Sequence, residues 1–350
     1  MAIEPKPARR RYRTGDEALD AKIAELVEAS AIGNDSDLLT EMLSSCFRVA
    51  RDRADRGEMK LVNAALKELA YAFKVFKAYR GVRKVSIFGS SRSGPEDPNY
   101  DCARSFAKAM AERGWMVITG AGPGVMEAGH EGAGAERSFG AAIRLPMEVE
   151  PNVVIEGDPK LINFKYFFTR KVTFLKESDA FALFPGGFGT LDEAFELLTL
   201  MQTGKSDLHP IVLLESEGEH YWEEWARFVE RHLAGHGLIS RADLDLVYIT
   251  DSIEAAVGEI EGFYRNYHSQ RYVDGTLVLR LQRLPDEASL ARLSGEFADI
   301  FRSGGGMRAA APSEAEAAEG DVPELPRLAL DFNQRSFGRL RWLIDALNGF

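Results

Sequence analysis

Residues 178–193 read Ser-Asp-Ala-Phe-Ala-Leu-Phe-Pro-Gly-Gly-Phe-Gly-Thr-Leu-Asp-Glu. A short apolar run over 179–184 ends at a glycine-rich turn, and Thr190 then opens a stretch with helical spacing. The order strand, glycine turn, helix is typical of a βαβ unit, whose turn lies beyond the carboxyl end of a parallel strand. The pattern predicts a buried strand feeding a helix, with a ligand site at the turn.

The same pattern recurs earlier in the chain. Residues 85–88 end at Gly89-Ser90-Ser91, and residues 115–118 run into Thr119-Gly120-Ala121-Gly122-Pro123-Gly124. Further apolar runs at 139–145, 210–214 and 246–249 are each followed by helical or loop stretches. Strands that alternate with helices predict an α/β protein with a Rossmann-like, doubly wound parallel sheet. The three glycine turns follow strands, so we expect them on one rim of that sheet.

The predicted sheet divides the chain into three segments. Residues 1–81 show helical periodicity and are expected to form an N-terminal helical segment. Residues 82–270 form the predicted Rossmann-like domain. Residues 271–350 are expected to form a small α/β module in the order strand, helix, linker, strand, helix. Its linker, 303–324, is rich in Gly, Ala, Glu and Pro, which is typical of a flexible connection.

Composition restricts the partners. The 43 basic and 54 acidic residues give a net charge of −11, which argues against a nucleic-acid partner because such binding needs clustered cations. No apolar run reaches the roughly 20 residues that a membrane span requires, and the basic N-terminus has no apolar stretch of the secretory kind. The two cysteines, Cys46 and Cys102, are too few for a disulfide framework or a cysteine zinc site. These features predict a cytoplasmic protein with no membrane partner.

The third glycine turn is suited to an anion. Gly186, Gly187 and Gly189 carry no side chains, so backbone N–H groups can approach a phosphate closely. The helix that follows presents unpaired N–H groups and the positive end of its dipole. We expect the Thr190 hydroxyl to serve as a helix cap or a phosphate donor.

Two acidic residues follow in what we expect to be the first turn of that helix. Asp192 and Glu193 either complement the helix dipole or handle ribose hydroxyls or a water molecule beside a bound phosphate. Leu191 and Phe195 are four residues apart and predict the apolar face of the helix, so we expect Glu193 to point away from it. Upstream, Arg170 and Lys171 begin another helical stretch. Cations at the start of a helix interact unfavourably with the helix dipole, which favours a role for these two residues in binding phosphate or a substrate carbonyl.

Several other kinds of site lack their residues. The third turn has no lysine where a Walker A loop places one, and the first two turns lack the glycine spacing of a dinucleotide fold. The six histidines show no His-Glu-x-x-His pair, and no Gly-x-Ser-x-Gly nucleophile elbow occurs. We therefore expect no metal and no organic cofactor.

The motifs resemble the signature of the LONELY GUY (LOG) family, often labelled "lysine decarboxylase-like". The resemblance rests on Thr169-Arg170-Lys171 and on Pro-Gly-Gly-Phe-Gly-Thr-Leu-Asp-Glu at 185–193, and it covers roughly 82–267. It implies a catalytic pair and a set of substrate- or phosphate-binding residues. The pair is Arg170 and Glu193, and the set is Gly89, Ser90, Ser91, Thr119, Gly120, Gly122, Gly124, Met126, Glu127, Lys171, Gly186, Gly187, Gly189 and Thr190.

The activity implied by this resemblance is hydrolysis of a nucleoside 5′-monophosphate, such as AMP or a cytokinin riboside monophosphate, to free base and ribose 5-phosphate. A carboxylate beside the ribose would stabilise the positive charge that develops as the N-glycosidic bond breaks. Arg170 would neutralise the phosphate or fix the base. A pyridoxal-dependent decarboxylase has no support, because nothing singles out a Schiff-base lysine. Family members are commonly dimers, which implies a homo-oligomer.

An alternative hypothesis is that the chain is a non-catalytic nucleotide-binding or carrier protein of the same superfamily. The presence of both Arg170 and Glu193 favours the enzyme. Typical members of the family lack both the helical front and the extension over 272–350, so the resemblance gives no role for those two segments.

Overall fold

The chain forms two compact units, Met1–Glu68 and Leu69–Phe350. The described part of the first unit is helical. The computed structural model describes residues 12–33, 35–145, 150–313, 316 and 322–350. The helices that begin the chain are α1 (Glu17–Ala29), α2 (Ser36–Arg51) and α3 (Arg56–Phe76), the last of which continues into the second unit. The Asp16 carboxylate caps α1 by accepting a hydrogen bond from the Leu19 N–H at 3.1 Å. These elements agree with the helical periodicity of the sequence.

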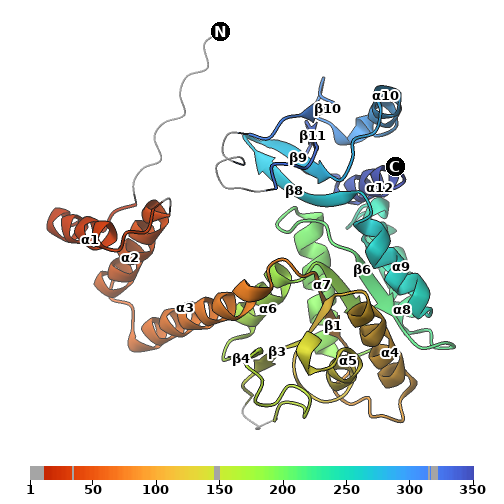
Figure 1. Ribbon diagram of the computed structural model, residues 1–350, viewed down its shortest axis with the longest axis horizontal. Helices are drawn as coiled ribbons and strands as arrows, with labels where there is room; N and C mark the ends of the chain where they lie inside the picture. Colours follow the sequence, from red (N-terminus) through yellow and green to blue (C-terminus); the bar gives the residue numbers. More distant parts are fainter. Residues whose placement is uncertain (1–11, 34, 146–149, 314–315, 317–321) are drawn as a thin grey trace. The chain divides into compact units, whose positions relative to one another are not determined.

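The second unit contains a parallel sheet (Figure 1). Within the described residues it has seven strands, whose spatial order is β4 (Leu161–Phe164), β3 (Ser138–Ile143), β2 (Met116–Thr119), β1 (Lys84–Phe88), β5 (Ala180–Leu183), β6 (Ile211–Leu214) and β7 (Val247–Thr250). The predicted Rossmann-like, doubly wound fold is confirmed. The sequence pattern missed β4, because this edge strand has four residues, one of them polar, and only two of the four are buried.

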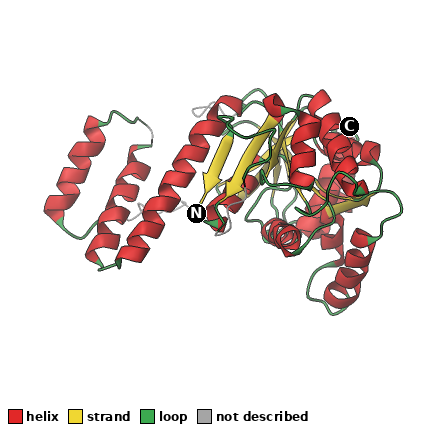
Figure 2. Ribbon diagram, turned by 90° about the horizontal axis from the view of Figure 1, so that it is seen from below, coloured by secondary structure: helices red, strands yellow, loops and turns green. Residues whose placement is uncertain are grey.

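Helices cover both faces of this sheet (Figure 2). Val85 and Ile87 of β1 face one apolar layer, whereas Phe88 faces the other, as the alternation of side chains along a strand requires. The first layer is completed by α4 (Pro98–Glu112), α5 (Val125–Ala133) and α9 (Ile253–Phe263), and the second by the end of α3, α6 (Phe167–Glu177) and α7 (Phe188–Gln202). Because both faces of the sheet are buried, most of its strands are continuous apolar runs in the sequence.

A second, antiparallel sheet follows. Its spatial order is β10 (Met307–Ala310), β11 (Arg327–Leu330), β9 (Thr276–Leu281) and β8 (Tyr267–Val273), and α10 (Glu287–Glu296) and α12 (Phe337–Asn348) accompany it. Leu277 and Leu279 share one apolar core with Leu197 and Met201 of α7. The strands β8 and β10 are additions to the expected order, and β10 lies in the stretch that composition indicates as a linker. Among the described residues, no helix has the length and apolar character of a membrane span.

The order of the parallel strands locates the site. The chain first builds outward from β1 through β2, β3 and β4, and it then returns to the other side of β1 with β5. Strand order therefore reverses between β1 and β5, which is where open α/β sheets bind their ligands. The loops that follow these two strands are the first and third glycine turns, so the two turns are neighbours.

Candidate active site

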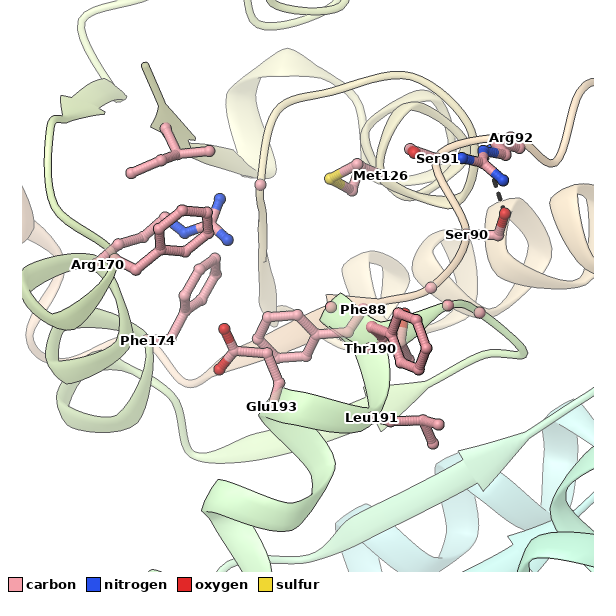
Figure 3. A pocket seen from close by; sticks show the side chains of 18 of the residues that line it. Phe88, Ser90, Ser91, Arg92, Met126, Arg170, Phe174, Thr190, Leu191 and Glu193 are labelled. Carbon is pink, nitrogen blue, oxygen red and sulfur yellow. Dashed lines mark hydrogen bonds between the residues drawn. The ribbon is translucent and has the colours of Figure 1, made fainter. Parts of the chain in front are cut away.

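A pocket of 780 Å³ opens at the carboxyl ends of β1 and β5 (Figure 3). All three glycine turns contribute to it. The lining residues are Phe88, Gly89, Ser90, Ser91, Arg92, Gly120, Met126, Ile143, Leu145, Phe167, Arg170, Phe174, Gly186, Gly187, Phe188, Gly189, Thr190, Leu191 and Glu193. Eleven of the sixteen residues expected at the site from the sequence therefore lie on one cavity wall.

The backbone of Ser90 joins the three turns. Its N–H donates to the Pro185 carbonyl at 3.1 Å, and its carbonyl accepts from the Val125 N–H at 3.0 Å. A side chain on Gly186 would place a Cβ 2.9 Å from the Cβ of Thr190 and 3.0 Å from the Ser90 nitrogen. The turns are therefore packed too closely to accept a methyl group at this position.

The third turn leads directly into α7. Gly187 is the N-cap residue and provides no side-chain cap, so the first N–H groups of α7 are left for another acceptor. The loop is held from outside by Tyr221, the first residue of α8 (Tyr221–Phe228), whose hydroxyl donates to the Gly186 carbonyl at 2.7 Å. This arrangement presents fixed N–H donors and a positive helix end to the cavity, which suits an anionic group.

Two details of the α7 prediction are wrong. The helix begins at Phe188 rather than Thr190, so Asp192 and Glu193 belong to its second turn, and the Thr190 hydroxyl makes no cap hydrogen bond. Glu193 is also only 6% exposed, whereas Phe195 is 38% exposed. The buried face of α7 follows Thr190, Ala194, Leu197 and Met201 instead of Leu191 and Phe195, and it carries Glu193 into the pocket wall.

Glu193 is a buried carboxyl group with charged neighbours. Burial raises its pKa to about 7, although the Lys171 ammonium and the Arg170 guanidinium act in the opposite direction. A carboxyl group with such a pKa changes its charge near neutral pH, which is the property expected of a catalytic acid or base.

Arg170 faces Glu193 from α6 (Figure 3). Its guanidinium carbon lies 5.1 Å from the centre of the Phe167 ring and 5.7 Å from that of Phe174. Burial lowers the pKa of Arg170, and its Nε is a buried atom with no hydrogen-bond partner among the described residues. A desolvated cation with a spare donor is chemically suited to an anion or to carbonyl and ring-nitrogen acceptors.

Lys171 lies behind Glu193 rather than on the pocket wall. Its Nζ is 2.8 Å from Asp192, 2.5 Å from Glu196 and 3.9 Å from Glu193 Oε1. Burial lowers the pKa of Lys171, but its hydrogen bonds to Asp192 and Glu196 outweigh that effect and raise it. Lys171 therefore lies beside Glu193 outside the pocket wall, where its charge lowers the pKa of the Glu193 carboxyl group.

Four more predicted residues, Thr119, Gly122, Gly124 and Glu127, also do not line the pocket. The Thr119 hydroxyl accepts from the Ala121 N–H at 3.0 Å and is 3.0 Å from the buried ring of His130, so it shapes the second turn from within. Gly124 has a φ of +73° and lies against Ser91, where a Cβ would be 2.7 Å from the Ser91 carbonyl carbon. Gly124 therefore allows the second turn to approach the first.

The apolar wall and one cation of the pocket were not predicted from the sequence. These lining residues are Phe88, Arg92, Ile143, Leu145, Phe167, Phe174, Phe188 and Leu191. Phe88 and Ile143 end strands whose loops open on the rim, and that position at a strand's carboxyl end is the signal that identifies them. Arg92 directly follows the first turn, and Phe167 and Phe174 flank Arg170 on α6.

The fold and pocket define a Rossmann-like α/β protein with a cavity at its topological switch point. A family model described as "Possible lysine decarboxylase" matches residues 121–260. A curated relative from Arabidopsis thaliana, "Probable cytokinin riboside 5′-monophosphate phosphoribohydrolase LOG6", is 30% identical over 154 residues, which are 43% of this chain and 73% of that protein. Cytokinin riboside 5′-monophosphate phosphoribohydrolase LOG3 of the same plant is 26% identical over 186 residues, covering 52% of this chain and 83% of that protein.

The chain belongs to the LOG family. Solved structures that match about half of the chain include the molybdenum cofactor carrier protein of Chlamydomonas reinhardtii, which is 20% identical, with 51% of this chain and 96% of that chain covered and a TM-score of 0.36. Another is the molybdenum cofactor binding protein of the phototrophic bacterium Rippkaea orientalis, at 19% identity, with 51% of this chain and 96% of that chain covered and a TM-score of 0.37.

Proposed function

We propose that this protein hydrolyses the N-glycosidic bond of a nucleoside 5′-monophosphate, such as AMP or a cytokinin riboside monophosphate. Water adds its oxygen to C1′ of the ribose, the C1′–N bond breaks, and the base leaves with a proton, which yields free base and ribose 5-phosphate. The observation that carries this proposal is that Glu193 and Arg170 line the same cavity as the Gly186–Thr190 turn. The curated relatives named as phosphoribohydrolases support it.

Each part of the pocket has a role in this reaction. The turn before α7 offers N–H donors to the phosphate, and the apolar wall accepts the base. Positive charge develops on the ribose as the bond weakens, so the Glu193 carboxylate stabilises the transition state and orients or deprotonates the water. Arg170 contributes donors beside the carboxylate.

A panel of nucleoside 5′-monophosphates tests the proposal. We expect the purified protein to release free base from at least one of AMP, GMP, CMP, UMP, IMP or an N6-prenylated AMP, as measured by chromatography, together with an equal amount of ribose 5-phosphate. A reaction without protein controls for spontaneous loss of base. If the protein binds these nucleotides and releases no base from any of them, the carrier interpretation replaces the enzymatic one.

The reaction should depend on pH through Glu193. Because the pKa of Glu193 is raised to about 7, the carboxylate forms only as pH rises through that value. We expect kcat/KM to increase about tenfold per pH unit below pH 7 and to level off above it. Lys171→Met removes a cation that lowers this pKa, so its profile should shift to higher pH. A profile that is flat between pH 5.5 and 8.5 would remove Glu193 ionisation from the mechanism.

A further inference from the structure

The pocket has a cation at each of two opposite ends (Figure 3). Arg170, Phe174 and Glu193 lie at one end, whereas Ser91 and Arg92 lie at the other. Packing shows the same division, because a Cβ on Gly120 would be 3.6 Å from Arg170 Nη1, and one on Gly186 would touch Ser90. The cavity is therefore polarised, and a nucleotide must enter it in one of two orientations.

Charge selects the orientation. Among the described residues that line the pocket, Glu193 is the single carboxylate, and it lies at the Arg170 end. A phosphate dianion beside a buried carboxylate would be repelled strongly, because the low dielectric of the site screens the two charges poorly. The opposite end has serine hydroxyls, the glycine turn and the start of α7, and no carboxylate among the lining residues that the structure describes. The phosphate therefore belongs at the Arg92 end, and the scissile bond belongs near Glu193.

Arg92 is placed to complete that end. Its backbone N–H donates to the Ser90 hydroxyl at 3.0 Å, which fixes the turn that carries it. The side chain lies on the exposed rim of the pocket, and no carboxylate among the described residues is within ion-pairing distance of it. Within the described residues, Arg92 thus has no acidic partner of its own, whereas Arg170 has the carboxyl group of Glu193 nearby.

We propose that Arg92 is the cation that binds the 5′-phosphate and selects nucleotides over nucleosides, while Arg170 serves the ribose and base at the Glu193 end. This assignment rests on the proposed function for its substrate and names the residue that recognises the phosphate. A guanidinium can donate two parallel hydrogen bonds to phosphate oxygens, which an ammonium cannot match in geometry. Because Arg92 is on the rim, the attraction should weaken as salt increases.

The test compares Arg92→Ala with Arg92→Lys. We expect Arg92→Ala to raise the KM for AMP about 10- to 100-fold and to change kcat less than about threefold, because a hydrogen-bonded charge is lost away from the reacting bond. The slow hydrolysis of adenosine, which lacks the phosphate, should keep its kcat/KM. Arg92→Lys should recover part of the loss, and the KM of Arg92→Ala should depend less on salt. Arg227→Ala, an exposed arginine on α8 outside the pocket, is the matched control.

Two outcomes overturn the assignment. A wild-type KM for AMP in Arg92→Ala shows that the side chain is only solvated, and loss of AMP-over-adenosine selectivity in Arg170→Ala but not in Arg92→Ala reverses the orientation. If the wild-type protein releases no base, the proposed function fails separately. Calorimetric titration of wild type and Arg92→Ala with AMP, adenosine and ribose 5-phosphate then still decides the role of Arg92, since only the phosphorylated ligands should bind less tightly to the variant.

Discussion

Glu193→Gln is expected to lower kcat by about 10²–10⁴-fold, the range typical of removing a positioned acid or base. Glutamine keeps the shape of the side chain but carries no negative charge, so it cannot stabilise the positive ribose or deprotonate water. The dissociation constant for AMP should change little, because the phosphate is held by the glycine turn. Single-turnover measurement of base release, with AMP binding measured alongside, checks this prediction.

The same variant should be more stable than the wild type at alkaline pH. The folded pKa of Glu193 is about 7, above its ordinary value of 4.5, so the folded protein binds this proton more tightly than the unfolded chain does. Stability attributable to this group is therefore lost between pH 4.5 and 7, and the loss reaches about 3 kcal/mol above pH 7. Glutamine avoids that cost, and denaturant unfolding at pH 5 and pH 8 should show a gain only at pH 8.

Lower turnover together with higher stability in Glu193→Gln would separate a catalytic role of Glu193 from a packing role, because replacing a packing residue lowers stability. Glu196→Gln, one turn further along α7 and outside the pocket, is the matched control, and it should retain most of the activity. Full turnover in Glu193→Gln would show that this carboxyl group plays no part in the reaction.

Gly124→Ala is expected to lower the free energy of unfolding by between about 2 and about 6 kcal/mol. The φ of +73° is costly for any residue with a Cβ, at about 1–3 kcal/mol. The added methyl group would also lie 2.7 and 2.8 Å from the Ser91 carbonyl carbon and Cα, and overpacking of this kind costs about 1–3 kcal/mol more. The second turn would move away from the first, and the hydrogen bond between Val125 N–H and the Ser90 carbonyl would be lost.

Gly134→Ala provides the comparison. Its φ of +75° is almost the same, but no atom lies within 4 Å of the position that a Cβ would occupy. This variant should therefore show only the backbone cost and should keep its affinity for AMP. Equal losses of stability and equal AMP affinity in the two variants would mean that the contact between the turns does not shape the pocket.

Much of the fold could be predicted from the sequence, because the buried strands are short apolar runs and three of them lead into glycine turns. That pattern located β1, β2 and β5 and the turns that follow them. Short strands at a sheet edge, whose residues are only partly buried, left no such signal. β4 is an edge strand of this kind, and β10 lies in a stretch whose composition suggests a linker.

The residues of the site could be predicted only in part from the sequence. Glycine turns identify where an anion can approach, and they identified Gly186 and Ser90 correctly as lining residues. The direction of Glu193 was predicted wrongly, because the buried face of α7 follows Ala194, Leu197 and Met201 and not the apolar pair Leu191 and Phe195. Arg92 was missed because one arginine after a turn is ordinary in sequence and acquires meaning only when its neighbours in space are known.

The position of β1 in the sheet also governs how the protein is made. β1 pairs with β5, whose first residue lies about 90 positions later in the chain, and the Ser90–Pro185 hydrogen bond closes the same long loop. In a nascent chain that ends before β5, β1 is an open sheet edge beside β2, and such an edge can pair with another chain. The edge of β1 stays open until β5 has been synthesised, and contacts between such distant segments form slowly. The addition of β5 and α7 therefore both covers this edge and completes the pocket. Active protein and aggregation-resistant protein should therefore appear together during translation.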